Sequence, residues 1–170
     1  MNKKWLIILG LILFMSSLKA QQLSNVYLNQ NGRASYRISL NNIYIVISES
    51  GKLKEIKTDA QGTIVYSTSK RVEQIGNTRI GFNYQDWVNT IGPVSVQYDY
   101  SGRVDRVGNL VIKYNYNGIV QSIGNQLITY NADNSMDMFD RYKITYNYNK
   151  QVQQVDNSNG LILLELNYDK

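Results

Sequence analysis

Residues 98–125 read YDYSGRVDRVGNLVIKYNYNGIVQSIGN, and this stretch contains two similar copies of one short sequence. In each copy a tyrosine and an Asn or Asp residue are followed by a glycine, a valine and a final apolar residue before Gly-Asn. The second copy begins sixteen residues after the first. A short internal repeat indicates an array of small structural units, so it decides how the rest of the chain is interpreted.

The period of sixteen residues extends well beyond these two copies. Five units start at Gly76, Gly92, Gly108, Gly124 and Asp140, and positions within a unit are counted from zero at these residues. Position 4 is always β-branched and apolar: Ile80, Val96, Ile112, Ile128 and Ile144. Position 6 is always aromatic: Phe82, Tyr98, Tyr114, Tyr130 and Tyr146. Positions 12 and 15 are apolar in all five units, and looser copies lie upstream, so the whole of residues 21–170 is interpreted as repeats.

Sixteen residues accommodate two short strands and two turns. The spacing from Asp99 to Gly102, and from Asn115 to Gly118, is typical of a type I turn that ends in a left-handed residue and closes a hairpin. The Gly-Asn pairs at 76, 108 and 124 are good two-residue hairpin loops. The sequence therefore predicts an all-β fold of tandem β-hairpin repeats.

The repeat also predicts which side chains share a face of the sheet. With the first turn as centre, Tyr98 lies opposite Val104, and position 4 shares their face because strand side chains alternate. The step of three residues from position 12 to position 15 breaks this alternation and predicts a β-bulge in each unit. We expect one antiparallel meander sheet, apolar on one face. Since about fourteen strands exceed the ~10 that an open sheet usually has, this sheet should be curled, and rolled or partly closed.

The first twenty residues have the layout of a secretory signal peptide. Lys3 and Lys4 precede an apolar run over 5–15, and small or polar residues lead to Ala20. Cleavage after Ala20 would leave a single domain at 21–170, exported to the periplasm or the cell exterior, and no later stretch is apolar enough to span a membrane. It would also remove three of the 18 basic residues and none of the 13 acidic ones, leaving a net charge of +2. This charge gives little reason to expect nucleic acid as a partner.

The stretch YDYSGRV resembles the tyrosine-aspartate (YD) repeat of Rhs and teneurin-type proteins. The resemblance is carried by Tyr98, Asp99, Gly102, Arg103 and Val104, and the next unit repeats it with Asn115 in place of the aspartate. It implies successive β-hairpins in a curling sheet. In that family such a sheet forms a hollow shell around a cargo domain; for this chain the resemblance supports the hairpins and not a shell.

Signals of catalysis are scarce. The chain has no histidine and no cysteine, so it lacks the common general base, the thiol nucleophile and the usual zinc ligands. Asp133, Ser135 and Asp137 alternate before Asp140, which is an arrangement of oxygen atoms that can bind calcium. The glycine and terminal glutamate of a calcium loop are absent, so we expect a polar turn there. The sequence predicts no enzyme, no metal and no cofactor.

Exposed aromatic residues remain as candidates for binding. Position 8, inside the first turn, is tyrosine in four units, which places a row of rings along one rim of the sheet: Tyr84, Tyr100, Tyr116 and Tyr148. Trp87 lies beside one of these turns. Such rings bind sugars or extended peptides; alternatively, each ring folds over its own hairpin and shields the backbone.

We therefore expect an exported, non-catalytic binding or structural module for a protein or glycan partner, with these five residues as candidate ligand-binding residues. The alternative is a small exported enzyme or enzyme inhibitor with a carboxylate site near Asp133 and Asp137. The sequence does not indicate the oligomeric state.

Overall fold

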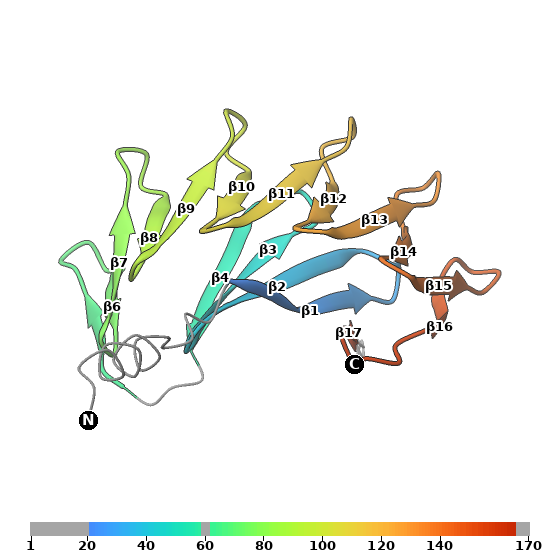
Figure 1. Ribbon diagram of the computed structural model, residues 1–170, viewed down its shortest axis with the longest axis horizontal. Coiled ribbons are helices and arrows are strands. Elements are labelled where there is room, and N and C mark those ends of the chain that lie inside the picture. Colours follow the sequence, from blue (N-terminus) through green and yellow to red (C-terminus); the bar gives the residue numbers. More distant parts are fainter. Residues whose placement is uncertain (1–20, 59–61, 166–170) are drawn as a thin grey trace, which may run out of the picture.

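The computed structural model describes residues 21–58 and 62–165, and within these ranges the chain is all-β, with seventeen strands and no helix. The strands form two sheets, one of five and one of twelve strands (Figure 1). The predicted leader, residues 1–20, lies outside the described residues. No helix capable of crossing a membrane occurs in the part of the chain that is described.

The smaller sheet has the order β17-β1-β2-β3-β4. Its strands are β1 (Gln22–Asn29), β2 (Ala34–Leu40), β3 (Ile43–Ser48), β4 (Leu53–Thr58) and β17 (Ile162–Glu165). Strands β1 to β4 are consecutive antiparallel neighbours, whereas β17 pairs in parallel with β1, Val26 lying opposite Ile162. The two ends of the described chain are thus joined in one sheet.

The larger sheet contains the strands from β5 to β16 in sequence order. Their bounds are β5 (Ile64–Tyr66), β6 (Val72–Ile75), β7 (Thr78–Phe82), β8 (Val88–Ile91), β9 (Val94–Tyr98), β10 (Val104–Val107), β11 (Leu110–Tyr114), β12 (Val120–Ile123), β13 (Gln126–Tyr130), β14 (Met136–Phe139), β15 (Tyr142–Tyr146) and β16 (Val152–Val155). Every pairing between these neighbours is antiparallel. Figure 1 shows their hairpins following one another along an arc, with β1 to β4 on its inner side.

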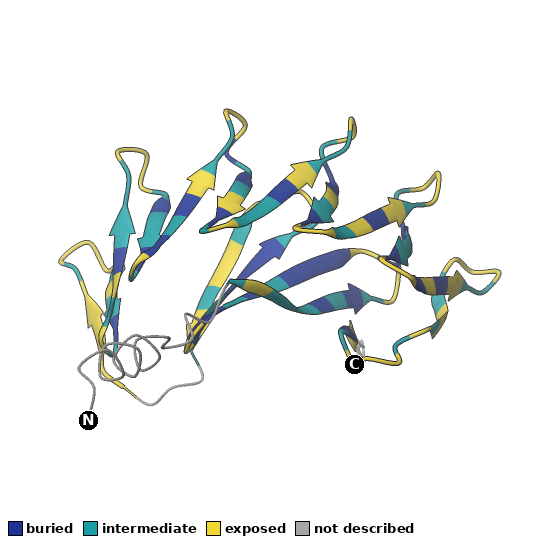
Figure 2. Ribbon diagram, viewed as in Figure 1, coloured by how far each residue is buried: buried dark blue, intermediate teal, exposed yellow. Residues whose placement is uncertain are grey.

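The prediction of a single meander sheet is therefore wrong: there are two sheets, one of them with a parallel edge. The difference arises in the upstream copies, whose strands β1 to β4 are six to eight residues long, against three to five in the larger sheet. These longer strands bury many side chains, as the dark blue of β2 and β3 in Figure 2 shows. Their apolar face fills the inner side of the arc.

The core lies between the two sheets and contains side chains from both. At position 4, the five aliphatic side chains are only 1–4% exposed. Val104 and Val107, at positions 12 and 15 of one unit, are wholly buried. Tyr98 and the other tyrosines at position 6 are half-buried and pack against the same core. The predicted apolar face is confirmed.

The predicted bulge and cross-strand pairs are also confirmed. Tyr98 lies opposite Val104, and the register shifts between Val104 and Arg106, which leaves Asp105 as the extra residue. Tyr114 and Val120 form the corresponding pair, with a register shift in the same pairing. The bulge turns position 15 back toward the core, so both ends of each short second strand are anchored there.

The first turn of each unit has the predicted left-handed residue. Its φ is +69° at Gly102 and +75° at Gly118, and it remains positive where the residue is Asn134 (63°) or Lys150 (62°). Each of these amides donates to the carbonyl three residues earlier, as Gly102 does to Asp99 at 2.9 Å. The same turn, with Gly51, joins β3 to β4. The two sheets therefore use one kind of hairpin.

The bulges connect the two sheets through the backbone. In four of the five units the amide of the position-12 residue donates to a carbonyl in a turn of the smaller sheet, at 2.8–2.9 Å: Val104 to Gly51, Val120 to Glu49, Met136 to Gly32 and Val152 to Gln30. Each of two turns of the smaller sheet therefore binds two hairpins. Glu49 and Gly51 provide the carbonyls in one turn, and Gln30 and Gly32 provide them in the other. A bulge leaves backbone groups outside the ladder, and these contacts satisfy its amide.

The carbonyl of the same bulge residue is satisfied by a tyrosine of the next hairpin. The Tyr114 hydroxyl donates to the carbonyl of Val104, and Tyr130 does the same to Val120, both at 2.5 Å. Tyr98 and Tyr146 repeat the contact, each with the carbonyl ten residues earlier. Burial disfavours the phenolate and raises the pKa of Tyr98 and of Tyr130 to about 12. The neutral tyrosine thus holds successive hairpins together.

Candidate binding surface

The candidate tyrosines occupy the tips of the hairpins. Tyr84, Tyr100, Tyr116 and Tyr148 lie in the turns that follow β7, β9, β11 and β15, and these turns form the outer rim of the arc (Figure 1). The four side chains are between 94% and 99% exposed. They do not fold over their own hairpins, so the shielding alternative is wrong. We call these four residues the tyrosine rim.

A hydrogen-bonded turn holds each ring in place. In the turn that carries Tyr100, the Asp99 carboxylate accepts the amides of Ser101 and Arg103, at 2.8 and 3.0 Å. It also pairs with the Arg103 Nε at 2.6 Å. Burial of Asp99 alone would raise the pKa of its carboxyl, but the hydrogen bonds from Arg103 and Ser101 hold this pKa below its usual value. The backbone under Tyr100 is thereby fixed before any ligand arrives.

Asparagine has the same role in the other turns of the rim. The Asn83, Asn115 and Asn147 side-chain oxygens each accept amides two and four residues further on. Asn or Asp at position 7 is therefore required for the structure of the turn. The side chain at position 8 projects into solvent, because the residue at position 7 makes the hydrogen bonds that hold the turn.

A cleft separates the tips of the β7–β8 and β9–β10 hairpins. It has a volume of about 580 Å³, and its aromatic walls are Tyr84, Trp87, Tyr98 and Tyr100. Polar side chains of both hairpins, including Asn83 and Gln97, complete the lining. Aromatic rings beside amide groups offer both stacking and hydrogen bonding to a ligand.

Trp87 differs from the tyrosine rim. It is half-buried, and its ring lies 5.1 Å from that of Tyr98 at an interplanar angle of 50°. A Cβ atom built on Gly102 would lie 2.7 Å from the Trp87 ring, so the indole lies directly against the next hairpin. Trp87 is therefore a wall of the cleft and a packing contact, whereas the four tyrosines are free.

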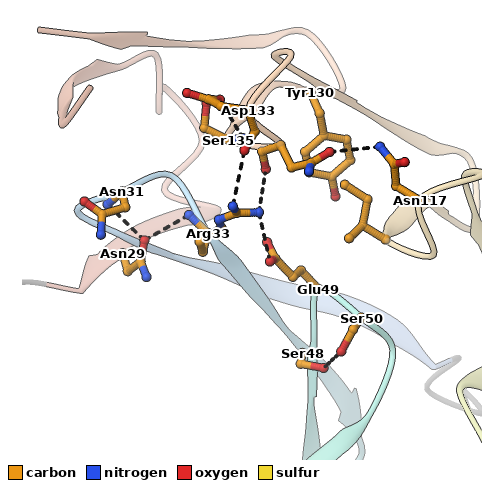
Figure 3. Close-up of polar contacts among 12 residues, drawn as sticks. Asn29, Asn31, Arg33, Ser48, Glu49, Ser50, Asn117, Tyr130, Asp133 and Ser135 are labelled. Carbon is orange, nitrogen blue, oxygen red and sulfur yellow. Dashed lines mark hydrogen bonds and ion pairs between the residues drawn. The ribbon is translucent and has the colours of Figure 1, made fainter. Parts of the chain in front are cut away.

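Ala132 interrupts the row in the turn between β13 and β14, and this turn, like the Tyr100 turn that Lys52 contacts, is bound to the smaller sheet. The Arg33 guanidinium donates to the carbonyls of Asp133 and Asn134, both at 3.2 Å, and pairs with Glu49 at 3.3 Å (Figure 3). Sequence reasoning missed Arg33 and Glu49. No local pattern identifies them, since Arg33 is 100 residues from Asp133.

Asp133 and Asp137, the carboxylates of the alternative site, have separate partners. The Asp133 carboxylate accepts the amide and hydroxyl of Ser135, and these bonds lower its pKa. Asp137 pairs with Lys143 and accepts a hydrogen bond from Thr129. A cavity of about 380 Å³ is lined by Asp133 but not by Asp137. Among the described residues, no cluster of three or more acidic residues is suited to a metal ion.

Comparisons with protein-family models, with curated protein sequences and with solved structures gave no match. The class that fold and surface define is thus an all-β protein of hairpins with an aromatic rim.

Proposed function

We propose that this chain is an exported, non-catalytic binding module, built of tandem sixteen-residue hairpins in a curled sheet, that recognises a protein or glycan partner through the tyrosine rim. Export is supported by the leader pattern of residues 1–20, with cleavage after Ala20. The repeat is supported by the Tyr-to-carbonyl bond that recurs with the same separation of ten residues in four hairpins.

The observation that carries the proposal is the exposure of a tyrosine at position 8 in four of the five units. Single exposed apolar groups are ordinary on protein surfaces. A row on one rim is different, because the core, turns and bulges of the hairpins do not require a ring at position 8, as Ala132 shows. Tyrosine supplies a large ring face and a hydroxyl with few rotatable bonds, which suits it to recognition.

The test is a binding measurement with defined probes. Immobilised β-1,4-linked glucan and chitin oligosaccharides serve as glycan probes, and a proline-rich peptide serves as the extended-peptide probe. The variant Tyr100→Ala/Tyr116→Ala/Tyr148→Ala should lose binding by about tenfold or more, since each aromatic contact contributes on the order of 0.5–1.5 kcal/mol.

Two controls accompany this variant. Leu127→Ala/Leu164→Ala removes exposed apolar side chains away from the rim and should retain binding. Asp137→Ala, which addresses the carboxylate alternative, should retain it too. Binding that survives the triple alanine variant, or that is lost in Asp137→Ala alone, would contradict a role for the rim.

A further inference from the structure

The two ends of the larger sheet are incomplete copies of its interior. Within residues 21–58 and 62–165, strand β5 pairs only with β6, and β16 only with β15, whereas every strand between them has two partners. Position 4 shows the consequence: Ile64 in β5 is 46% exposed, whereas its counterparts in the five following units are 1–4% exposed. Tyr66, at position 6, is 58% exposed. These apolar side chains lack the preceding unit that covers their equivalents.

The same hydrogen bond is missing at both ends. In the interior, each position-6 hydroxyl donates to the carbonyl of position 12 in the unit before it, as Tyr146 does to Met136. In the described part of the chain, no hairpin precedes Tyr66 in its sheet. At the other end, the residue ten positions after Val152 is Ile162, which has no hydroxyl and belongs to the smaller sheet. The Tyr66 hydroxyl is thus the donor, and the Val152 carbonyl the acceptor, for the hydrogen bond that joins neighbouring units in the interior of the sheet.

Charge also distinguishes these two edges from an edge that avoids pairing. Strand β4, one edge of the smaller sheet, carries Lys54, Glu55 and Lys57, as protected edge strands commonly do. Strand β5 reads IVY and β16 reads VQQV, with no charged residue in either. An edge strand without charged side chains leaves its unpaired backbone groups open to another strand.

We propose that copies of this chain associate head to tail, with β16 of one copy pairing antiparallel with β5 of the next and continuing the larger sheet. The occupant of each edge is a second copy because the junction already exists within the chain. Gln74 pairs with Arg79, and Met138 with Lys143, so position 14 lies opposite position 3 of the following unit. The same register places Gln154 opposite Thr63 of the second copy. It also places the Tyr66 hydroxyl of that copy at the carbonyl of Val152.

This association is heterologous, since different edges meet, so it produces a ring if the rotation closes and an open filament if it does not. The contact covers Ile64 and Tyr66 in the manner of Ile80 and Phe82 within the chain. The rim remains free in such an assembly, because it lies at the hairpin tips rather than at the sheet edges.

Sedimentation of residues 21–170 over a series of protein concentrations tests the proposal. The weight-average mass should rise about twofold or more for the unaltered chain, and should stay at the monomer value for Ile64→Asp/Tyr66→Asp. Both residues are already exposed, so this variant should fold, which circular dichroism verifies. Leu127→Asp, an exposed apolar position in the middle of the sheet, is the matched control and should associate normally.

Cysteine cross-linking tests the register. The chain has no cysteine, so Thr63→Cys and Gln154→Cys provide single thiols in two separate preparations. Oxidation of the mixture should give a disulfide-linked pair in several-fold excess over either preparation alone. A monomer at every concentration, or equal linkage in the mixture and in the separate preparations, would overturn the proposal and assign the edges to a strand of a different protein or of the same chain.

Discussion

At the scale of single residues, the tyrosines of this protein serve two unrelated purposes, and sequence position alone distinguishes them. At position 6 the ring packs on the core and its hydroxyl donates to a bulge carbonyl, as in Tyr114. Two residues later the ring is exposed, as in Tyr116. The intervening Asn115 closes the turn and separates the two environments.

This difference predicts the effect of removing one oxygen atom. Tyr114→Phe leaves the carbonyl of the buried Val104 without its hydrogen-bond donor and should lower the free energy of unfolding by about 1–3 kcal/mol. Tyr116→Phe, two residues away and exposed, is the control and should change stability by less than about 0.5 kcal/mol. Urea midpoints of the two variants measure this. Equal midpoints would show that the hydroxyl contact contributes nothing.

At the scale of the element, the structure of each hairpin is determined by its own sequence, except for one hydrogen bond that a distant segment must supply. Its turns, its Tyr-to-Val pair and its bulge follow from sixteen residues of sequence, since Asp99, Gly102 and the step from Val104 to Val107 each have a local physical meaning. The bulge then presents an amide that only another segment can satisfy. This explains why the hairpins were predictable and their attachment to the smaller sheet was not.

The tyrosines at position 6 also make stability depend on pH. Burial raises the pKa of Tyr98 and of Tyr130 to about 12, against an ordinary value near 10. Between about pH 10 and pH 12 the unfolded chain therefore binds fewer protons than the folded chain, and the free energy of unfolding falls as the pH rises. Below pH 10, roughly, the contribution is fully present.

Urea midpoints measured across this interval should decline with pH, and less steeply for Tyr98→Phe/Tyr130→Phe than for the unaltered chain. Tyr84→Phe/Tyr116→Phe removes the same number of hydroxyls from exposed rings and serves as the control. The proposal that buried phenols cause the decline fails if the two double variants have the same pH dependence.

At the scale of the whole molecule, the division into two sheets has no signal in the repeat itself. The turns at Gly32 and Gly51 have the same geometry as those of the larger sheet, so the sequence pattern predicts one array for all the hairpins. Their longer strands, and the pairing of β17 with β1, are what set them apart. That pairing joins Val26 to Ile162, and no local sequence feature encodes a contact between residues so far apart in the chain. Likewise, the sequence period predicts the tyrosine rim, because its residues all occupy position 8. It does not predict the hydrogen bond between Arg33 and Asp133, which lie 100 residues apart.

Because the core lies between the sheets, we expect the two sheets to unfold together. Ile45 lies in β3 of the smaller sheet and is wholly buried in the shared core. Trp87 lies in the larger sheet's β7–β8 turn and is the only tryptophan of residues 21–170, so its fluorescence reports on that turn and its surroundings. Ile45→Ala should lower the stability reported by Trp87 by about 2–5 kcal/mol, since the cavity is shared by both layers. Far-UV circular dichroism should give the same urea midpoint as the fluorescence, as two-state unfolding requires. A Trp87 midpoint that does not move, while the circular dichroism signal is lost in two steps, would show that the arc of hairpins is stable without the sheet it surrounds.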